Sequence, residues 1–147
     1  MSSSETIKCF IDKVLNNRCC HTLIIHRSGE HGMVSIAKEW IGMITSEKIN
    51  MLVSVIGNGE FDEALLEDVD VVLLLNCIMP KPDGLEILER IYGTKPEVPV
   101  VVSSRTNDEQ LINRITGFSN VVFKQKPDGA VGLFWALDEI LFPESVQ

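Results

Sequence analysis

The sequence predicts an α/β fold in which a doubly wound parallel sheet of five strands carries helices on its faces. Two observations support this: five short apolar runs that are nearly continuous, and segments of helical character that lie between them. Continuous runs of Val, Ile and Leu are typical of strands buried on both faces. Strict alternation of strand and helix predicts right-handed crossover connections.

The predicted elements follow from these patterns. The strands are HTLIIH (21–26), NMLVSVIG (50–57), DVVLLLN (70–76), VPVVVSS (98–104) and NVVF (120–123). The helical segments are 31–45, 61–67, 84–92, 107–116 and 129–142. In the clearest of them, 84–92, Asp83 is placed to cap the N-terminus, and Gly93 stands where a helix often ends.

An additional amphipathic helix is predicted ahead of the first strand, over residues 4–17. Its apolar stripe has the spacing of one helical face and consists of Ile7, Phe10, Ile11, Val14 and Leu15. The chain is therefore divided into an N-terminal helix, 1–19, and one α/β domain, 20–147. Two interpretations of the stripe stay open: it packs onto its own domain, or it pairs with another protein or with a second copy in a homodimer.

Composition excludes several classes of protein. With 147 residues and 45% hydrophobic content, the chain has the size and composition of one packed domain. Its formal charge of −8 repels phosphate backbones and anionic lipid, so neither nucleic acid nor a membrane surface is an expected partner. No apolar run reaches the roughly 20 residues of a membrane helix, and MSSSETIKCF lacks the pattern of a signal peptide. A soluble cytoplasmic protein is expected.

Cysteine and histidine patterns do not predict a metal site. The four cysteines include no pair with the CxxC spacing of zinc or redox motifs. Cys19 and Cys20 are interpreted as ordinary thiols, with redox sensitivity of the adjacent pair as the alternative. His26 and Cys77 offer two soft ligands without a third, and His21 is interpreted as a loop or surface residue.

One segment, DVVLLLNCIMPKPDGLEILERI (70–91), resembles the third strand, following loop and third helix of a response-regulator receiver domain. In that family an aspartate ends the strand, Met-Pro follows at the third and fourth positions on, and a glycine opens the helix. The residues at those places here are Asn76, Met79, Pro80 and Gly84. The resemblance extends over 21–142 and implies the family's sheet order, 2-1-3-4-5.

Two further receiver landmarks are present, each with an ambiguity. VPVVVSSR resembles the fourth strand with its signalling Ser/Thr, for which Ser104 is the best match and Ser103 the alternative. FKQKP resembles the fifth strand with the family's pocket lysine. Spacing favours Lys124, whereas the Lys-Pro dipeptide favours Lys126, and both remain candidates.

The departures from the family bear most directly on function. Receivers carry two acidic residues at the end of the first strand, and these hold Mg²⁺ together with the phosphoacceptor aspartate. Here His26 and Arg27 stand at that place, and Asn76 stands at the acceptor. Because an amide is not a carboxylate nucleophile, the resemblance implies a degenerate phosphorylation pocket that forms no acyl phosphate.

The charge of this pocket is also expected to differ from that of the family. A receiver pocket has about three carboxylates and one lysine, near −2, while Arg27 with one lysine gives roughly +2. We therefore expect the Mg²⁺ site to be lost and no cofactor to bind. The Arg27 guanidinium is a candidate to fill the vacated metal position and to donate a hydrogen bond to the Asn76 oxygen.

These observations predict a pseudo-receiver that works in signal transduction by protein–protein interaction, independently of phosphorylation. Receivers usually bind partners through the fourth helix, fifth strand and fifth helix, which would correspond to 107–142. The expected contact residues are Asn107, Asp108, Gln110, Asn113, Arg114 and Lys124. The expected partners are signalling proteins, among them a histidine kinase or a phosphotransfer protein of a two-component phosphorelay.

Two other functions remain open. One is a decoy or adaptor that docks a histidine kinase or phosphotransfer protein without accepting phosphate. The other is a sensor of an anion or small ligand in the altered pocket. An enzyme is not predicted, because the sequence displays no recognisable pair of nucleophile and base.

Overall fold

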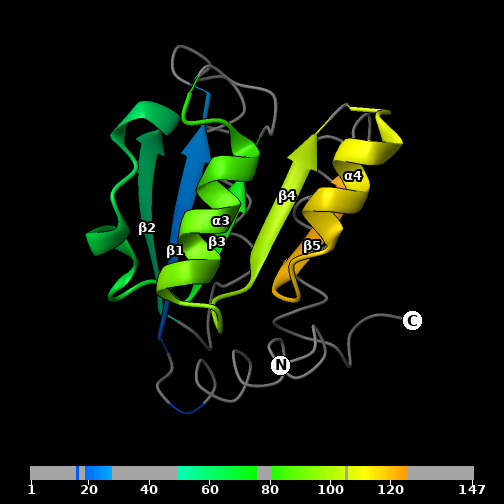
Figure 1. Cartoon of the computed structure of the whole chain (residues 1–147). Helices are drawn as coiled ribbons and strands as arrows, with labels where there is room; N and C mark the ends of the chain where they lie inside the picture. The colour runs from blue at the N-terminus through cyan, green and yellow to red at the C-terminus, as the bar shows by residue number, and fades with distance from the viewer. Residues whose placement is uncertain (1–15, 17–18, 28–49, 76–80, 105, 126–147) are drawn as a thin grey trace.

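The structure, a computed structural model, describes residues 16, 19–27, 50–75, 81–104 and 106–125. Figure 1 shows the described elements in colour. For residues 50, 51, 124 and 125 only the backbone is described. The predicted N-terminal stripe and the predicted helices 31–45 and 129–142 lie outside the described residues.

A five-stranded parallel sheet forms the centre of the molecule. Its strands are β1 (Cys19–His26), β2 (Asn50–Gly57), β3 (Val71–Leu74), β4 (Val100–Ser104) and β5 (Val121–Gln125). They are arranged in the order β2-β1-β3-β4-β5, with all four pairings parallel. The predicted fold class and the predicted sheet order are confirmed, and strand boundaries differ from the predicted ones by at most two residues.

Side chains from both faces of the sheet are buried. On one face, Leu23, Val72 and Val102 belong to the main hydrophobic cluster and are at most 1% exposed. Because side chains alternate along a strand, Ile24 and Leu73 point to the opposite face, and these too are fully buried. Burial on both faces explains why the strands read as continuous apolar runs in the sequence.

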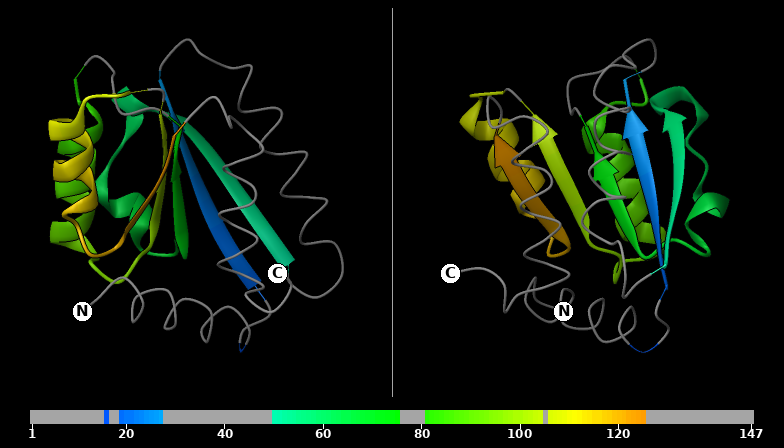
Figure 2. Two further views of the ribbon diagram at one scale, coloured as in Figure 1. Left: turned by 90° about the vertical axis from the view of Figure 1, so that its right-hand side faces the viewer. Right: turned by 180° about the vertical axis from the view of Figure 1, so that it is seen from behind.

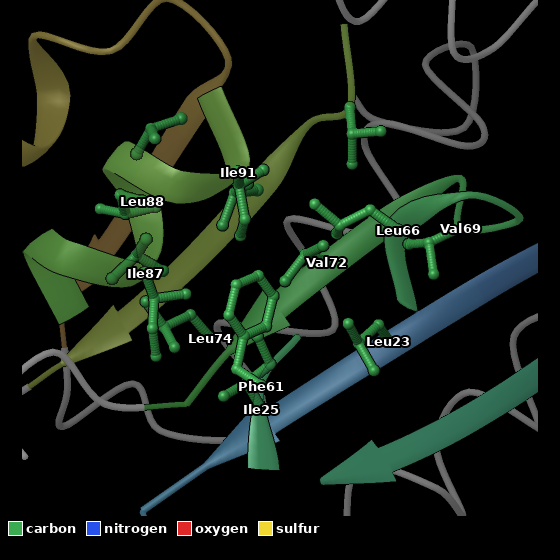
Figure 3. Packing of buried hydrophobic residues seen from close by; sticks show 14 of the residues in the cluster. Leu23, Ile25, Phe61, Leu66, Val69, Val72, Leu74, Ile87, Leu88 and Ile91 are labelled. Atoms are coloured by element: carbon green, nitrogen blue, oxygen red, sulfur yellow. The ribbon is translucent and has the colours of Figure 1, made fainter. Parts of the chain in front are cut away.

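Two helices cover the face that carries the main cluster, α3 (Gly84–Thr94) and α4 (Glu109–Thr116). Both lie on the same side of the sheet (Figure 2). Ile87, Leu88 and Ile91 of α3 point into the cluster toward Leu74 and Val72 (Figure 3). Complete burial of each such side chain contributes roughly 1.5–3 kcal/mol to folding, so this face anchors α3 on the sheet.

The start of α3 matches the prediction, while its end does not. Asp83 caps the helix, since its side chain accepts a hydrogen bond from the Glu86 backbone N–H at 3.0 Å. Gly93 does not end the helix, which continues to Thr94 and is capped at Lys95, whose backbone N–H donates to the Ile91 carbonyl. The cap therefore forms without a left-handed glycine, and Gly93 is an exposed residue of the last turn.

The connection between β2 and β3 corrects the prediction of a helix over 61–67. It contains two short 3₁₀ helices, η1 (Asn58–Glu60) and η2 (Glu63–Leu66), separated by extended backbone at Phe61 and Asp62. Phe61 is 6% exposed and packs in the main cluster (Figure 3). The extended backbone at Phe61 and Asp62 interrupts the helix at the point where the Phe61 ring enters the core.

Arg90 of α3 binds this connection through an ion pair and a cation–π contact. Its guanidinium donates to both carboxylate oxygens of Glu63, with an Nε–Oε2 distance of 3.0 Å. It also lies over the Phe61 ring, 4.8 Å from the ring centroid. The hydrogen bond from Arg90 lowers the pKa of Glu63 below its usual value, and the same bond raises the pKa of Arg90. The ion pair is thus bidentate and well oriented.

Lys95 makes a second tie between α3 and this connection. Its Nζ donates to the carbonyl oxygens of Leu66, Glu67 and Val69 at 3.0, 3.0 and 3.2 Å. Three carbonyls of one turn are therefore satisfied by one ammonium group. This arrangement holds the turn between η2 and β3 against the end of α3.

The adjacent cysteines have different surroundings. Cys19 is half-buried and Cys20 is fully buried, and both are free thiols. As neighbours in β1 they point to opposite faces of the sheet, a geometry unlike that of a disulfide pair. The structure thus favours the interpretation as ordinary thiols. Within the described ranges, no helix is long and apolar enough to span a membrane.

Candidate functional site

The carboxyl ends of the strands lie together at one edge of the sheet, because all pairings are parallel. The arrowheads of β1, β2 and β4 point to this edge in Figure 1. The order of the strands reverses between β1 and β3, which is where open α/β sheets usually bind ligands. Of the predicted pocket residues, His26, Arg27 and Ser104 are described at this edge, whereas Asn76 and Lys126 lie outside the described residues.

His26 ends β1 and is 7% exposed. Its Nδ1 lies 2.9 Å from the carbonyl oxygen of Arg27. Since a carbonyl only accepts hydrogen bonds, Nδ1 carries a proton in this contact. Arg27 itself is exposed. The end of β1 therefore presents an imidazole and a guanidinium, and neither is a hard oxygen ligand for Mg²⁺.

Asn58 follows the end of β2 and is 2% exposed. Its Nδ2 donates to the Pro82 carbonyl oxygen at 3.1 Å. This bond joins the end of β2 to the segment that precedes α3, across 24 positions of the sequence. Asn58 and Gly59 are part of the 3₁₀ helix η1, and Asn58 also contacts the segment before α3.

A series of short hydrogen bonds leads from β4 to α4. The Ser104 hydroxyl accepts from the Thr106 N–H at 3.3 Å, and the Thr106 hydroxyl accepts from the Asp108 N–H at 3.2 Å. The Asp108 carboxylate then caps α4 by accepting from the N–H groups of Gln110 and Leu111. Ser104 is 1% exposed, so its hydroxyl belongs to the buried start of this series.

The register of β5 leaves both lysine candidates open. Lys124 lies within β5 and pairs with Ser103, while Gln125 pairs with Ser104. Only the backbone of Lys124 is described, and Lys126 lies outside the described residues. Ser103 and Ser104 are both buried at the end of β4.

The predicted contact residues on α4 and the turn before it are exposed. They are Asn107, Asp108, Gln110, Asn113 and Arg114. Asp108 has a structural task as well, since its carboxylate is the N-cap of α4. These polar side chains are therefore exposed on α4 and on the turn before it. The helix α4 lies beside β5 (Figure 1).

Two residues at this edge, Thr106 and Asn58, are not predicted as functional residues by the sequence patterns. The series from Ser104 through Thr106 to Asp108 has a spacing of two residues, the spacing of side-chain-to-backbone turns formed by Ser, Thr and Asp. This spacing is a signal that the sequence carries. The Asn58–Pro82 bond has no comparable signal, because it joins segments far apart in the sequence.

Comparison with known proteins places the fold. No family model matches the chain. A receiver domain of a DNA-binding response regulator from Colwellia psychrerythraea superimposes with a TM-score of 0.65 at 17% identity, covering 82% of this chain and 98% of that one. A receiver domain protein from Clostridium thermocellum gives a TM-score of 0.65 at 18% identity, covering 86% and 97%. The fold is thus that of response-regulator receiver domains.

Two curated relatives match part of the sequence. A protein-glutamate methylesterase/protein-glutamine glutaminase from Rhodospirillum rubrum is 40% identical over 83 residues, which are 55% of this chain and 22% of that protein. A probable C4-dicarboxylate response regulator from Bacillus subtilis is 33% identical over 85 residues, 57% of this chain and 38% of that protein. The chain thus matches well under half the length of these relatives.

Proposed function

We propose that this protein is a pseudo-receiver, which works in signal transduction by protein–protein interaction without aspartyl phosphorylation. One observation carries the proposal: β1, the strand that ends in the acidic residues of a receiver, ends here in His26 followed by Arg27. Similarity to receiver folds and to a probable response regulator supports the signalling role. The sequence supplies Asn76 in place of the nucleophilic aspartate.

The chemistry of phosphoryl transfer explains why these substitutions matter together. Charge on the transferred group is neutralised by a metal ion, and the metal is held by carboxylates. At the end of β1, His26 donates Nδ1–H to a backbone carbonyl, and Arg27 brings a positive charge. A positive charge at this place attracts anions and repels Mg²⁺. We therefore infer that neither the metal nor the acyl phosphate forms.

The proposed contact surface is α4 with β5. The exposed residues Gln110, Asn113 and Arg114 offer hydrogen-bond donors and acceptors on a helix that is capped and anchored to the sheet. In this proposal the partner is a signalling protein such as a histidine kinase or a phosphotransfer protein. Partner binding would then depend on the amount of this protein and not on its phosphorylation.

The decisive test restores the pocket in two steps. Asn76→Asp alone is expected to gain no phosphate from acetyl phosphate with Mg²⁺, because His26 and Arg27 hold no metal and Arg27 pairs with the new carboxylate. The triple variant His26→Asp, Arg27→Asp, Asn76→Asp is expected to gain it, with Lys124 or Lys126 completing the pocket. Intact-mass spectrometry reads both results. Phosphorylation of the single variant contradicts the proposal.

A second test concerns Mg²⁺ directly. A ligand raises the melting temperature only by binding the native state more tightly than the unfolded state. Millimolar MgCl₂ is therefore expected to leave the melting temperature of the wild-type protein equal to that in NaCl at the same ionic strength. The triple variant is the positive control. A rise of several degrees in the wild-type protein with Mg²⁺ alone contradicts the loss of the metal site.

A further inference from the structure

His21 and Ser54 form a pair at the other edge of the sheet. His21 lies inside β1 and is half-buried, which corrects its interpretation as a loop or surface residue. Its Nε2 is 2.7 Å from the Oγ of Ser54, in the neighbouring strand β2. Its Nδ1 is 3.2 Å from the carbonyl oxygen of Asp68. The fold thus brings together a hydroxyl, an imidazole and an orienting carbonyl from three segments.

The Asp68 carbonyl sets which nitrogen of a neutral His21 ring carries the proton. A carbonyl oxygen accepts and cannot donate, so Nδ1 of His21 carries the proton. In the neutral ring Nε2 is then unprotonated, and the Ser54 hydroxyl donates to it. This is the orientation in which an imidazole removes a proton from an attacking serine, with a third group holding the base.

The surroundings of the pair favour a neutral, partly apolar reactant. Leu52, the register partner of His21, is 51% exposed and offers apolar contact beside the serine. The Asp70 carboxylate accepts a hydrogen bond from the His21 backbone N–H at 2.8 Å. Two further acidic residues, Glu67 and Asp68, are exposed and lie close to Asp70 in the sequence. These carboxylates disfavour the approach of anionic donors such as acyl phosphates.

We propose that Ser54 is an activated nucleophile that takes acyl groups from neutral esters, with His21 as its general base. Ser54 Oγ forms a bond to the ester carbonyl carbon while its proton passes to Nε2 of His21. The bond from that carbon to the leaving oxygen then breaks, and the alcoholate or phenolate departs. The imidazolium returns its proton to water, which leaves neutral His21 and an acylated Ser54.

The half-buried position of both side chains is compatible with this reaction. Ser54 and His21 both retain partial exposure, which attack on an ester from solution requires. Ser119 provides an internal comparison, since it is also half-buried and, within the described part of the chain, has no hydrogen bond to a histidine. Ser54 and Ser119 thus have similar exposure, and only Ser54 of the two is hydrogen-bonded to a histidine among the described residues.

The test treats the full chain with p-nitrophenyl acetate and maps acetylation by peptide mass spectrometry. Ser54 is expected to acetylate at least about tenfold faster than Ser119 in the folded wild-type protein, a modest part of the 10²–10⁴-fold that positioned bases supply in enzymes. In urea this preference should vanish. Equal rates at the two serines in the folded protein overturn the proposal, and this measurement needs no variant.

Two variants distinguish the effect of the His21 base on Ser54 acetylation from the effect of solvent exposure. His21→Gln retains a group that accepts the Ser54 hydrogen bond but removes the base, so acetylation of Ser54 should slow at least about tenfold. Ser119→Ala is the control and should leave Ser54 unchanged. Circular dichroism checks that both variants fold. Unchanged labelling of Ser54 in folded His21→Gln, or faster labelling by acetyl phosphate than by the ester, contradicts the proposal.

Discussion

The two ends of β1 each carry a histidine in a different setting. His26, at the carboxyl end, is buried and bonds to the carbonyl of the next residue, Arg27. His21, near the amino end, is half-buried and connects β1 to Ser54 and to Asp68 through its ring. Its backbone N–H adds a bond to Asp70, 49 positions away in the sequence.

This difference extends to the two edges of the sheet. At the carboxyl edge, the bonds of His26 and Ser104 that are described above join residues within the same loop, and Asn58 is the exception. At the amino edge, side chains join segments that are far apart, with Lys95 adding three bonds from α3. These long-range side-chain bonds at the amino edge are therefore expected to contribute to stability.

Removing Lys95 should have the largest effect among these ties. Lys95→Met loses three charge-assisted hydrogen bonds to carbonyls, and we expect the free energy of unfolding to fall by about 2 kcal/mol. Urea denaturation measures this change. The control is Lys81→Met, an exposed lysine, with an expected change within about 0.5 kcal/mol. Equal effects of the two substitutions would show that the amino edge is not held as described.

The His21–Ser54 bond should have a smaller but measurable effect. His21→Leu removes two side-chain hydrogen bonds, with an expected cost of about 1–2 kcal/mol. A double-mutant cycle with Ser54→Ala isolates the pair, and its coupling energy should be about 0.5–1.5 kcal/mol. The parallel cycle with Ser119→Ala should be additive. If both cycles are additive, the bond does not contribute to stability.

The Glu63–Arg90 ion pair should have the smallest effect, one that depends on pH. The pKa of Glu63 is lowered in the folded protein by its hydrogen bond to Arg90. The stabilisation is therefore present above the unfolded pKa, whose ordinary value is 4.5, and is lost as pH falls through the folded pKa. Wild-type protein and Glu63→Gln should differ in stability near neutral pH and converge in acid. A difference independent of pH contradicts this assignment.

Local patterns predicted much of the molecule. The apolar runs located all five strands, and Asp83 and Gly84 located the start of α3. These features depend on neighbours in the sequence, because strand burial and helix capping are set within a few residues. The sheet order was expected from the receiver resemblance, and the structure confirms it.

Other features required the tertiary structure. The helix expected over 61–67 is replaced by 3₁₀ turns, because burying Phe61 in the core outweighs local helical preference. The helix α3 also continues past Gly93 to Thr94, and the side chain of its C-cap residue, Lys95, donates to the β2–β3 connection. Helix propensity alone predicts neither the 3₁₀ turns nor the end of α3.

The residues of the candidate sites also differ in whether the sequence alone could place them. The sequence by itself determined that His26 and Arg27 end the first strand, since the run before them is continuous and apolar. It could not place His21 beside Ser54, because 33 positions separate them and only the parallel register of β1 with β2 brings them within hydrogen-bonding distance. Composition decides which chemical groups the chain carries. Strand pairing decides which of them meet, because it joins residues that have no local relation in the sequence.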